Sequence, residues 1–152
     1  MKIINNIIIR KFKKSDARQC VALIEVNKEN MGDLYTPDSL ISASLSNQYW
    51  VAETTERIVG MIGFSDLHNG IGMLLTLSVL PQMQRMGIGR ALIETAKKYA
   101  KKNHFRKILL LTHAKNKPMM LLAIQQDFIP EGSLKNHFRT GDDVIYLSYF
   151  LE

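Results

Sequence analysis

The sequence predicts a protein of the α/β class (α+β type), with a mixed, mostly antiparallel sheet of about seven strands flanked by about four helices. The first observation behind this prediction is length. The chain has 152 residues, close to the usual size of one domain, and no repeat, low-complexity tract or linker divides residues 1–152. The second observation is the order of the predicted elements. Strand-like and helix-like stretches follow one another without a regular βα alternation, which favours a mixed sheet. We therefore expect a single domain with helices on the faces of its sheet.

The first half of the chain contains signals for several strands and two helices. The β-branched run Ile3–Arg10 predicts a strand. Ser15 is a candidate helix cap, because apolar residues follow it at the spacing of one helix face. Thr36-Pro37 predicts the start of a second, short helix, with Thr as the cap and Pro in the first turn. Further strands are predicted at Tyr49–Thr54, Ile58–Ser65 and Ile71–Leu80, with a hairpin turn at Asn69-Gly70.

The second half begins with a strand that is expected to lie at the centre of the sheet. Ile71–Leu80 is almost entirely apolar, which is typical of a strand covered on both faces, and Pro81 ends it. A clear amphipathic helix is predicted from about Gly87 to Asn103. The remaining predicted elements are a strand at Ile108–Thr112, a short helix from Pro118 to about Gln126, and a hairpin of Leu134–Phe138 and Val144–Leu151 around Gly141-Asp142.

Composition excludes several classes of protein. A hydrophobic content of 46% excludes a disordered tail, and a charged content of 22% excludes a membrane bundle. The single cysteine, Cys20, can form neither an intrachain disulfide nor a cysteine-based metal site, which fits a reducing compartment. The apolar stretch at the N-terminus ends at Arg10 and is shorter than the ~7–15 apolar residues of a signal sequence. We therefore expect a cytoplasmic protein with no membrane partner and no metal.

The basic charge points to anionic ligands, but its placement limits this interpretation. The 20 Lys and Arg against 14 Asp and Glu leave a net charge of +6. Many of the cations gather at the predicted end of the Gly87–Asn103 helix, where the helix dipole favours positive charge. These residues are Lys97, Lys98, Lys101, Lys102, Arg106 and Lys107. Because no basic stripe with interleaved aromatic residues is present, nucleic acid is not expected as a partner.

The most informative segment is a glycine-containing loop between a buried strand and a helix. It reads Gln84-Arg85-Met86-Gly87-Ile88-Gly89-Arg90. The first turn of a helix has unpaired N–H groups and a positive dipole end, and glycines allow a ligand to approach closely, so this arrangement favours a phosphate. A dinucleotide-binding fingerprint fits poorly, because Leu92 stands where its third glycine is required. The alternative to an anion site is a strand-to-helix turn that binds nothing.

The residues around this loop resemble the GNAT superfamily of N-acyltransferases. The pattern Gln84-x-x-Gly87-x-Gly89, with Leu77-Ser78-Val79 and Pro81 before it and Ala91-Leu92 after it, is similar to the acetyl-CoA-binding motif of that family. Asn116 follows the predicted fifth strand, where many members have an Asn. The resemblance covers nearly the whole chain and implies the acyl-CoA N-acyltransferase fold.

The resemblance also implies which residues bind the co-substrate, acetyl-CoA. Main-chain N–H groups of the loop would bind its pyrophosphate, and Leu77 and Val79 would pair through their main chain with its pantetheine arm, between splayed fourth and fifth strands. A main-chain N–H near Val79 or Leu80 would polarise the thioester carbonyl. Asn116 would either contact the pantetheine or cap the following helix. The loop residues in this set are Gln84, Arg85, Met86, Gly87, Ile88, Gly89 and Arg90.

Two departures from the family leave the catalytic residues unassigned. Many members have a proton-donating Tyr seven residues after the Asn, and this chain has Ala123 there. Members with a carboxylate base often carry it early in the fourth strand, where this chain has Ile71–Leu77 and no acid. The histidines His68, His113 and His137 are only weak substitutes. The acids Asp33 and Asp38, near the variable acceptor region, are a slight signal for a cationic amine.

The resemblance implies an N-acetyltransferase that moves an acetyl group from acetyl-CoA to a primary amine by direct attack. The acceptor is a small molecule, a peptide or a protein, and the sequence does not distinguish among them. The alternative is a catalytically silent acyl-CoA-binding module, which the missing Tyr at Ala123 would suit. A homodimer is kept as an alternative to a monomer.

Overall fold

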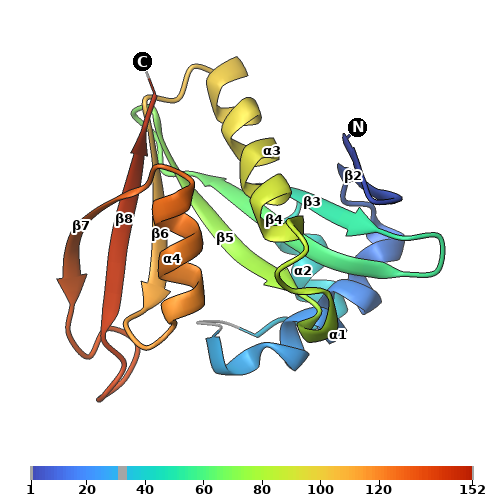
Figure 1. The fold of residues 1–152 in the computed structure, drawn as a ribbon, viewed down its shortest axis with the longest axis horizontal. Helices are drawn as coiled ribbons and strands as arrows, with labels where there is room; N and C mark the ends of the chain where they lie inside the picture. The colour runs from blue at the N-terminus through green and yellow to red at the C-terminus, as the bar shows by residue number, and fades with distance from the viewer. Residues whose placement is uncertain (1, 31–33, 152) are drawn as a thin grey trace.

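The computed structural model describes residues 2–30 and 34–151 of the chain, and eight strands in this part form one sheet (Figure 1). The strands lie in the order β1-β2-β3-β4-β5-β6-β8-β7. Their bounds are β1 Lys2–Ile4, β2 Ile7–Lys11, β3 Gln48–Glu53, β4 Ile58–Asp66, β5 Ile71–Val79, β6 Lys107–His113, β7 Ile129–Leu134 and β8 Val144–Phe150. The helices are α1 Ala17–Val26, α2 Pro37–Ala43, α3 Ile88–Lys102 and α4 Lys117–Gln125. Short 3-10 turns cover Lys14–Asp16, Lys28–Asn30 and Pro81–Met83.

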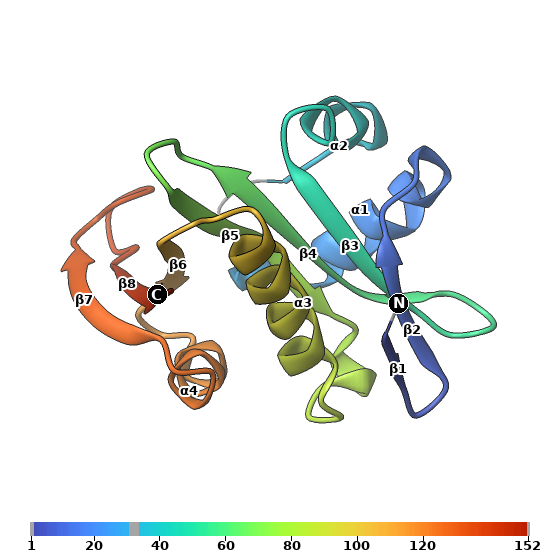
Figure 2. The same cartoon turned by 90° about the horizontal axis from the view of Figure 1, so that it is seen from above.

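The predicted fold class is confirmed. Neighbouring strands pair antiparallel throughout the sheet except β5 and β6, which are parallel. Helices α3 and α4 lie on one face of the sheet, and α1 and α2 lie on the other (Figure 2). The α3 side holds the larger apolar cluster, which includes Phe64, Leu92 and Ile108. The α1 side holds a second cluster around Leu23, Leu40 and Met61.

The sheet has one strand more than expected because the run Ile3–Arg10 is not continuous. Asn5 and Asn6 have φ angles of 47° and 66°, so they form a two-residue turn between β1 and β2, with Ile4 paired to Ile7. Two consecutive residues with positive φ give a turn whose twist matches that of a hairpin, and Asn tolerates this conformation. The apolar run therefore folds back on itself and adds an outer strand.

Two other local predictions were wrong. The strand predicted at Leu134–Phe138 is instead β7, Ile129–Leu134, an edge strand that pairs with β8 and tolerates Pro130 there. The β7–β8 connection is held by Asn136, whose N–H donates to Asp143 and whose Oδ1 accepts from the Gly141 N–H. Ser15 does not cap a helix, because it lies within a 3-10 turn before α1.

Within the described residues, no helix combines the length and the apolar character that crossing a membrane would require. Cys20 is buried in α1 as a free thiol, and burial raises its pKa to about 12. This cysteine therefore behaves as a small core residue and not as a nucleophile.

Candidate active site

The candidate site lies where β5 and β6 separate. Their parallel pairing covers only Ile71–Met73 against Lys107–Leu109, although β5 continues to Val79 and β6 to His113. Figure 1 shows the two strands diverging beyond the paired ends. The remaining lengths of both strands thus leave main-chain groups without a partner on the other strand, in the middle of the sheet. A divergence of the fourth and fifth predicted strands is what the sequence led us to expect.

A bulge in β5 sets which main-chain groups face this gap. The β4–β5 register shifts between Met61 and Gly63, so that Thr76 and Leu77 together lie opposite one β4 residue, and Thr76 has a φ of 45°. Beyond the bulge, the Leu80 N–H donates to Val59 O at 2.9 Å.

The bonding pattern distinguishes the main-chain orientations of Val79 and Leu80, the two positions where a carbonyl-polarising N–H was expected. Bonded and non-bonded pairs alternate along an antiparallel ladder, so Val79, which pairs with Gly60, directs its N–H and C=O away from β4 and toward the gap. The Val79 carbonyl agrees with this, since it accepts from Asn27 Nδ2 at 3.1 Å and Gln84 Nε2 at 3.3 Å. The Leu80 N–H is already bonded to Val59 O, so of these two N–H groups it is that of Val79 that faces the gap.

The loop before α3 turns through two residues with positive φ. Arg85 has a φ of 63°, and Gly87, the residue preceding the helix, has a φ of 83°. A Cβ on Gly87 would have no neighbouring atom within 4 Å, so the glycine is needed for its backbone conformation and not for space. Gln84 bonds back to the end of β5 through Val79, which joins the loop to the gap.

The start of α3 presents free donors. The first intrahelical bond runs from the Ala91 N–H to Gly87 O at 3.0 Å, so the N–H groups of Ile88, Gly89 and Arg90 lie at the open helix end. Gly87 makes no side-chain cap bond, and the first turn contains no acidic residue. The helix dipole therefore favours an anion at this end.

The side chains of these loop residues differ in their exposure and in their contacts. Ile88 is 2% exposed and belongs to the core, so only its main chain is available to a ligand. A Cβ on Gly89 would lie 3.1 Å from Leu122 Cδ2 of α4, which means that this glycine also lets α3 and α4 approach. Arg90 Nε bonds Glu94 Oε1 at 3.1 Å, while Arg85 and Met86 are exposed.

Asn116 caps α4. Its Oδ1 accepts from the Met119 N–H at 3.2 Å, and its own N–H donates to His113 O. The capping role, one of the two roles left open for Asn116, is therefore seen. The two N–H bonds of its Nδ2 group remain able to donate to a ligand. Ala123, seven residues or about two turns further along α4, is fully buried and offers no proton.

Two residues near the site have roles that the sequence did not reveal. Asn27, at the end of α1, donates to Ser78 Oγ at 2.7 Å as well as to Val79 O, so it fixes α1 against the end of β5. Lys97 was expected on a solvated helix end but is half-buried, with its Nζ 4.0 Å from the centre of the Tyr149 ring and bonded to Gln126 O. Burial lowers the pKa of Lys97. Neither position carries a signal in a single sequence, because both roles depend on distant elements.

Of the two acids expected near the acceptor region, the described residues include Asp38. Asp33 lies outside the described residues, and Asp38 is exposed in the first turn of α2. Across residues 2–30 and 34–151, no group of three His, Cys, Asp or Glu side chains is placed to hold a metal ion.

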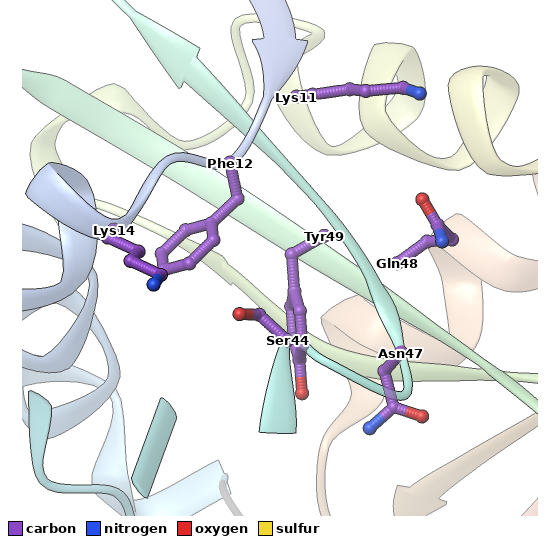
Figure 3. A pocket seen from close by; sticks show the side chains of 7 residues that line it. All are labelled: Lys11, Phe12, Lys14, Ser44, Asn47, Gln48 and Tyr49. Carbon is purple, nitrogen blue, oxygen red and sulfur yellow. The ribbon is translucent and has the colours of Figure 1, made fainter. Parts of the chain in front are cut away.

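A pocket of about 150 Å³ lies away from the β5–β6 gap (Figure 3). Phe12 and Tyr49 line it with their rings 6.0 Å apart. Its remaining lining residues are Lys11, Lys14, Ser44, Asn47 and Gln48. None of these belongs to the loop before α3 or to β5 or β6, so this pocket is separate from the candidate site.

Comparison with known proteins agrees with the fold described above. The profile of the acetyltransferase (GNAT) family matches residues 12–128 of the chain. An uncharacterized N-acetyltransferase of Methanocaldococcus jannaschii is 36% identical over 95 residues. That alignment covers 60% of this chain and 58% of the length of the relative.

Solved structures of acetyltransferases share the fold across almost the whole chain. Ard1 from Thermoplasma volcanium has a TM-score of 0.87 at 16% identity, covering 97% of this chain and 99% of that one. A ribosomal-protein-alanine N-acetyltransferase from Brucella melitensis has a TM-score of 0.83 at 18% identity, covering 95% of this chain and 99% of that one. At these identities the likeness concerns the fold alone.

Proposed function

Because this chain belongs to the GNAT family of acetyltransferases, we propose that it is an N-acetyltransferase that moves the acetyl group of acetyl-CoA to a primary amine. The observation that supports this most strongly is the open end of α3, with three main-chain donors, no acidic residue and no side-chain cap, directly after the diverging strand β5. Such an end suits a pyrophosphate.

The described residues fit acetyl-CoA in two further respects. Val79 directs its main-chain groups into the gap between β5 and β6, and Leu77 lies two residues before it in the bulge, so an extended pantetheine arm can bond here like an added strand. Asn116 Nδ2 is available to the same arm at the start of α4. The proposed set comprises Leu77, Val79, Gln84, Arg85, Met86, Gly87, Ile88, Gly89, Arg90 and Asn116. Bound acetyl-CoA supplies an activated thioester carbonyl.

In the proposed reaction the chain acts mainly through orientation. The Val79 N–H, directed into the gap, would donate to the thioester oxygen as negative charge develops on it. Holding the amine and the thioester together in a reactive orientation supplies most of the remaining rate acceleration. The acceptor class stays a small-molecule amine, a peptide or a protein, with no nucleic acid or membrane partner, and we place the reaction in the cytoplasm. The same proposal allows two oligomeric states, a monomer and a homodimer.

A silent acyl-CoA-binding module is the second candidate, because the position of the family's usual proton donor is the buried Ala123. Incubating the protein with acetyl-CoA and a panel of amines and peptides distinguishes the two candidates. Release of CoA thiol in proportion to an amine supports the transferase. Tight acetyl-CoA binding with no thiol release on any amine would favour the silent module.

Gly89→Asp tests the loop assignment. We expect acetyl-CoA affinity, measured by calorimetry, to fall by at least about tenfold, equivalent to ~1.4 kcal/mol, because a carboxylate would meet the pyrophosphate. The matched control is Gly89→Ala, which adds the same contact with Leu122 without the charge and is expected to lose much less. Equal affinities for wild type and Gly89→Asp would contradict the assignment.

A further inference from the structure

The imidazole of His113 has a buried nitrogen without a partner. Its Nε2 atom is buried and has no hydrogen-bond partner among the described residues. The other buried side-chain N or O atoms without a hydrogen-bond partner in the described part of the chain are Tyr49 OH, Thr76 Oγ1 and Ser148 Oγ. Buried polar groups in native proteins are nearly always satisfied, so a group left without a partner in the protein points to water or a ligand.

The position of His113 along β6 places it at the gap. It is the last residue of β6, four residues beyond Leu109, where pairing with β5 ends. Because the two strands separate after Leu109, His113 lies on the part of β6 that borders the gap.

The face of the sheet on which His113 lies is the face from which an amine would approach. Ile108 and Leu110 point into the core beneath α3 and α4, so the alternate residues Leu109, Leu111 and His113 lie on the opposite face. The donors of the open α3 end belong to the α3 side of the sheet (Figure 2). A co-substrate with its phosphates at that end would thus present its thioester through the gap, and the acceptor would reach it from the side of His113.

The segments around His113 provide an aromatic cover and also carry several charged side chains. Phe138 of the β7–β8 connection packs on the imidazole with ring centres 5.8 Å apart, and His137 packs on Phe138 at 4.8 Å. The other titratable side chains on the segments around it are Tyr146 of β8, Lys115 on the turn before α4, and Lys135, His137, Arg139, Asp142 and Asp143 of the connection. Asp142 is paired with Arg139, and Asp143 accepts from the Asn136 N–H.

We propose that His113 is the residue that takes the proton from the acceptor amine. This inference rests on the proposed transferase function. The amine nitrogen attacks the thioester carbon, a C–N bond forms, and the C–S bond breaks with its electron pair leaving on sulfur. The proton lost by the nitrogen passes to His113 Nε2, giving an imidazolium, and then leaves through water to the CoA thiolate, so that the products are the amide and CoA thiol. Histidine suits this role because its charge changes near neutral pH.

The test compares His113→Gln, which keeps a polar atom but cannot carry the proton, with wild type over pH 5.5 to 9. The matched control is His137→Gln, at the neighbouring exposed histidine. The assay follows CoA thiol release from acetyl-CoA, using whichever of L-lysine, spermidine and an alanine-initiated tripeptide reacts fastest. Calorimetric binding of CoA to each variant checks that the site is folded. A third variant, His113→Ala, is assayed with and without added imidazole.

We expect His113→Gln to lower kcat/KM at least about 100-fold, to flatten the acid limb of the pH profile and to leave the CoA Kd within about twofold. His137→Gln should behave as wild type, and imidazole should restore part of the rate of His113→Ala. A wild-type rate and pH profile in His113→Gln would overturn this inference alone. If wild type releases no thiol with any amine while CoA binds, the transferase proposal and this inference both fail.

Discussion

At the scale of single residues, Asp16 is the clearest case of a side chain whose role appears only in the folded chain. Arg10 of β2 bonds both Asp16 carboxylate oxygens, at 2.7 and 2.9 Å, and also bonds Glu53 of β3. The Lys13 N–H donates to Asp16 as well. Burial by itself would raise the pKa of Asp16, but these hydrogen bonds outweigh it and hold the pKa below its usual value.

Asp16→Asn is expected to lower the free energy of unfolding by about 3 kcal/mol at pH 7, because Arg10 is left partly buried without its main partner. The lowered pKa means that this stabilisation is complete above the ordinary Asp pKa of about 3.9 and is lost as the pH falls through the folded-state value. Urea unfolding at pH 7 and pH 3 measures both effects. Glu25→Gln, which breaks the exposed pair with Lys28, is the control and should cost under about 0.5 kcal/mol.

At the scale of elements, α4 is fixed at both of its ends by side chains that bond to the main chain. Asn116 caps its first turn, and Lys97 of α3 bonds Gln126 O at its last turn. The face of α4 that meets α3 includes Leu122, which lies against Gly89. The distance between the two helices next to the proposed pyrophosphate site therefore depends on the small size of one glycine.

Asn116→Ser separates the two roles of the cap residue. A serine hydroxyl still accepts from the Met119 N–H, so the free energy of unfolding should change by less than about 0.5 kcal/mol, whereas Asn116→Ala should lose about 1 kcal/mol. If Asn116 Nδ2 contacts the pantetheine, both variants should bind acetyl-CoA more weakly in calorimetry. Normal affinity in Asn116→Ser would mean that Asn116 is only a cap.

At the scale of the whole molecule, the two apolar clusters lie on opposite faces of one continuous sheet. β4 contributes Phe64 to one cluster and Met61 to the other, so neither cluster is complete without the same strand. We propose on this ground that residues 1–152 form one cooperative unit.

Calorimetric melting should accordingly show one transition, and acetyl-CoA at 100 times its Kd should stabilise the folded state by about 2.7 kcal/mol. The transition temperature should rise with ligand concentration, because the proposed ligand contacts β5, α3 and α4 only when all three are in place. Two separate transitions, of which one responds to acetyl-CoA, would contradict a single unit.

The sequence by itself determined the fold class, the four helices and the glycine loop. These features depend on local periodicity and on residues such as Thr36, Gly87 and Asn116 that act within a few positions of themselves. It did not determine the turn at Asn5-Asn6 or the position of β7, because a short apolar run does not show where it folds back or which partner it finds. Tertiary structure alone decided that Val79 and not Leu80 directs its N–H into the gap, that Lys97 is half-buried, and that His113 lies on the part of β6 that has separated from β5. Each of these depends on the register of strands distant in sequence, and register is set by packing across the whole sheet.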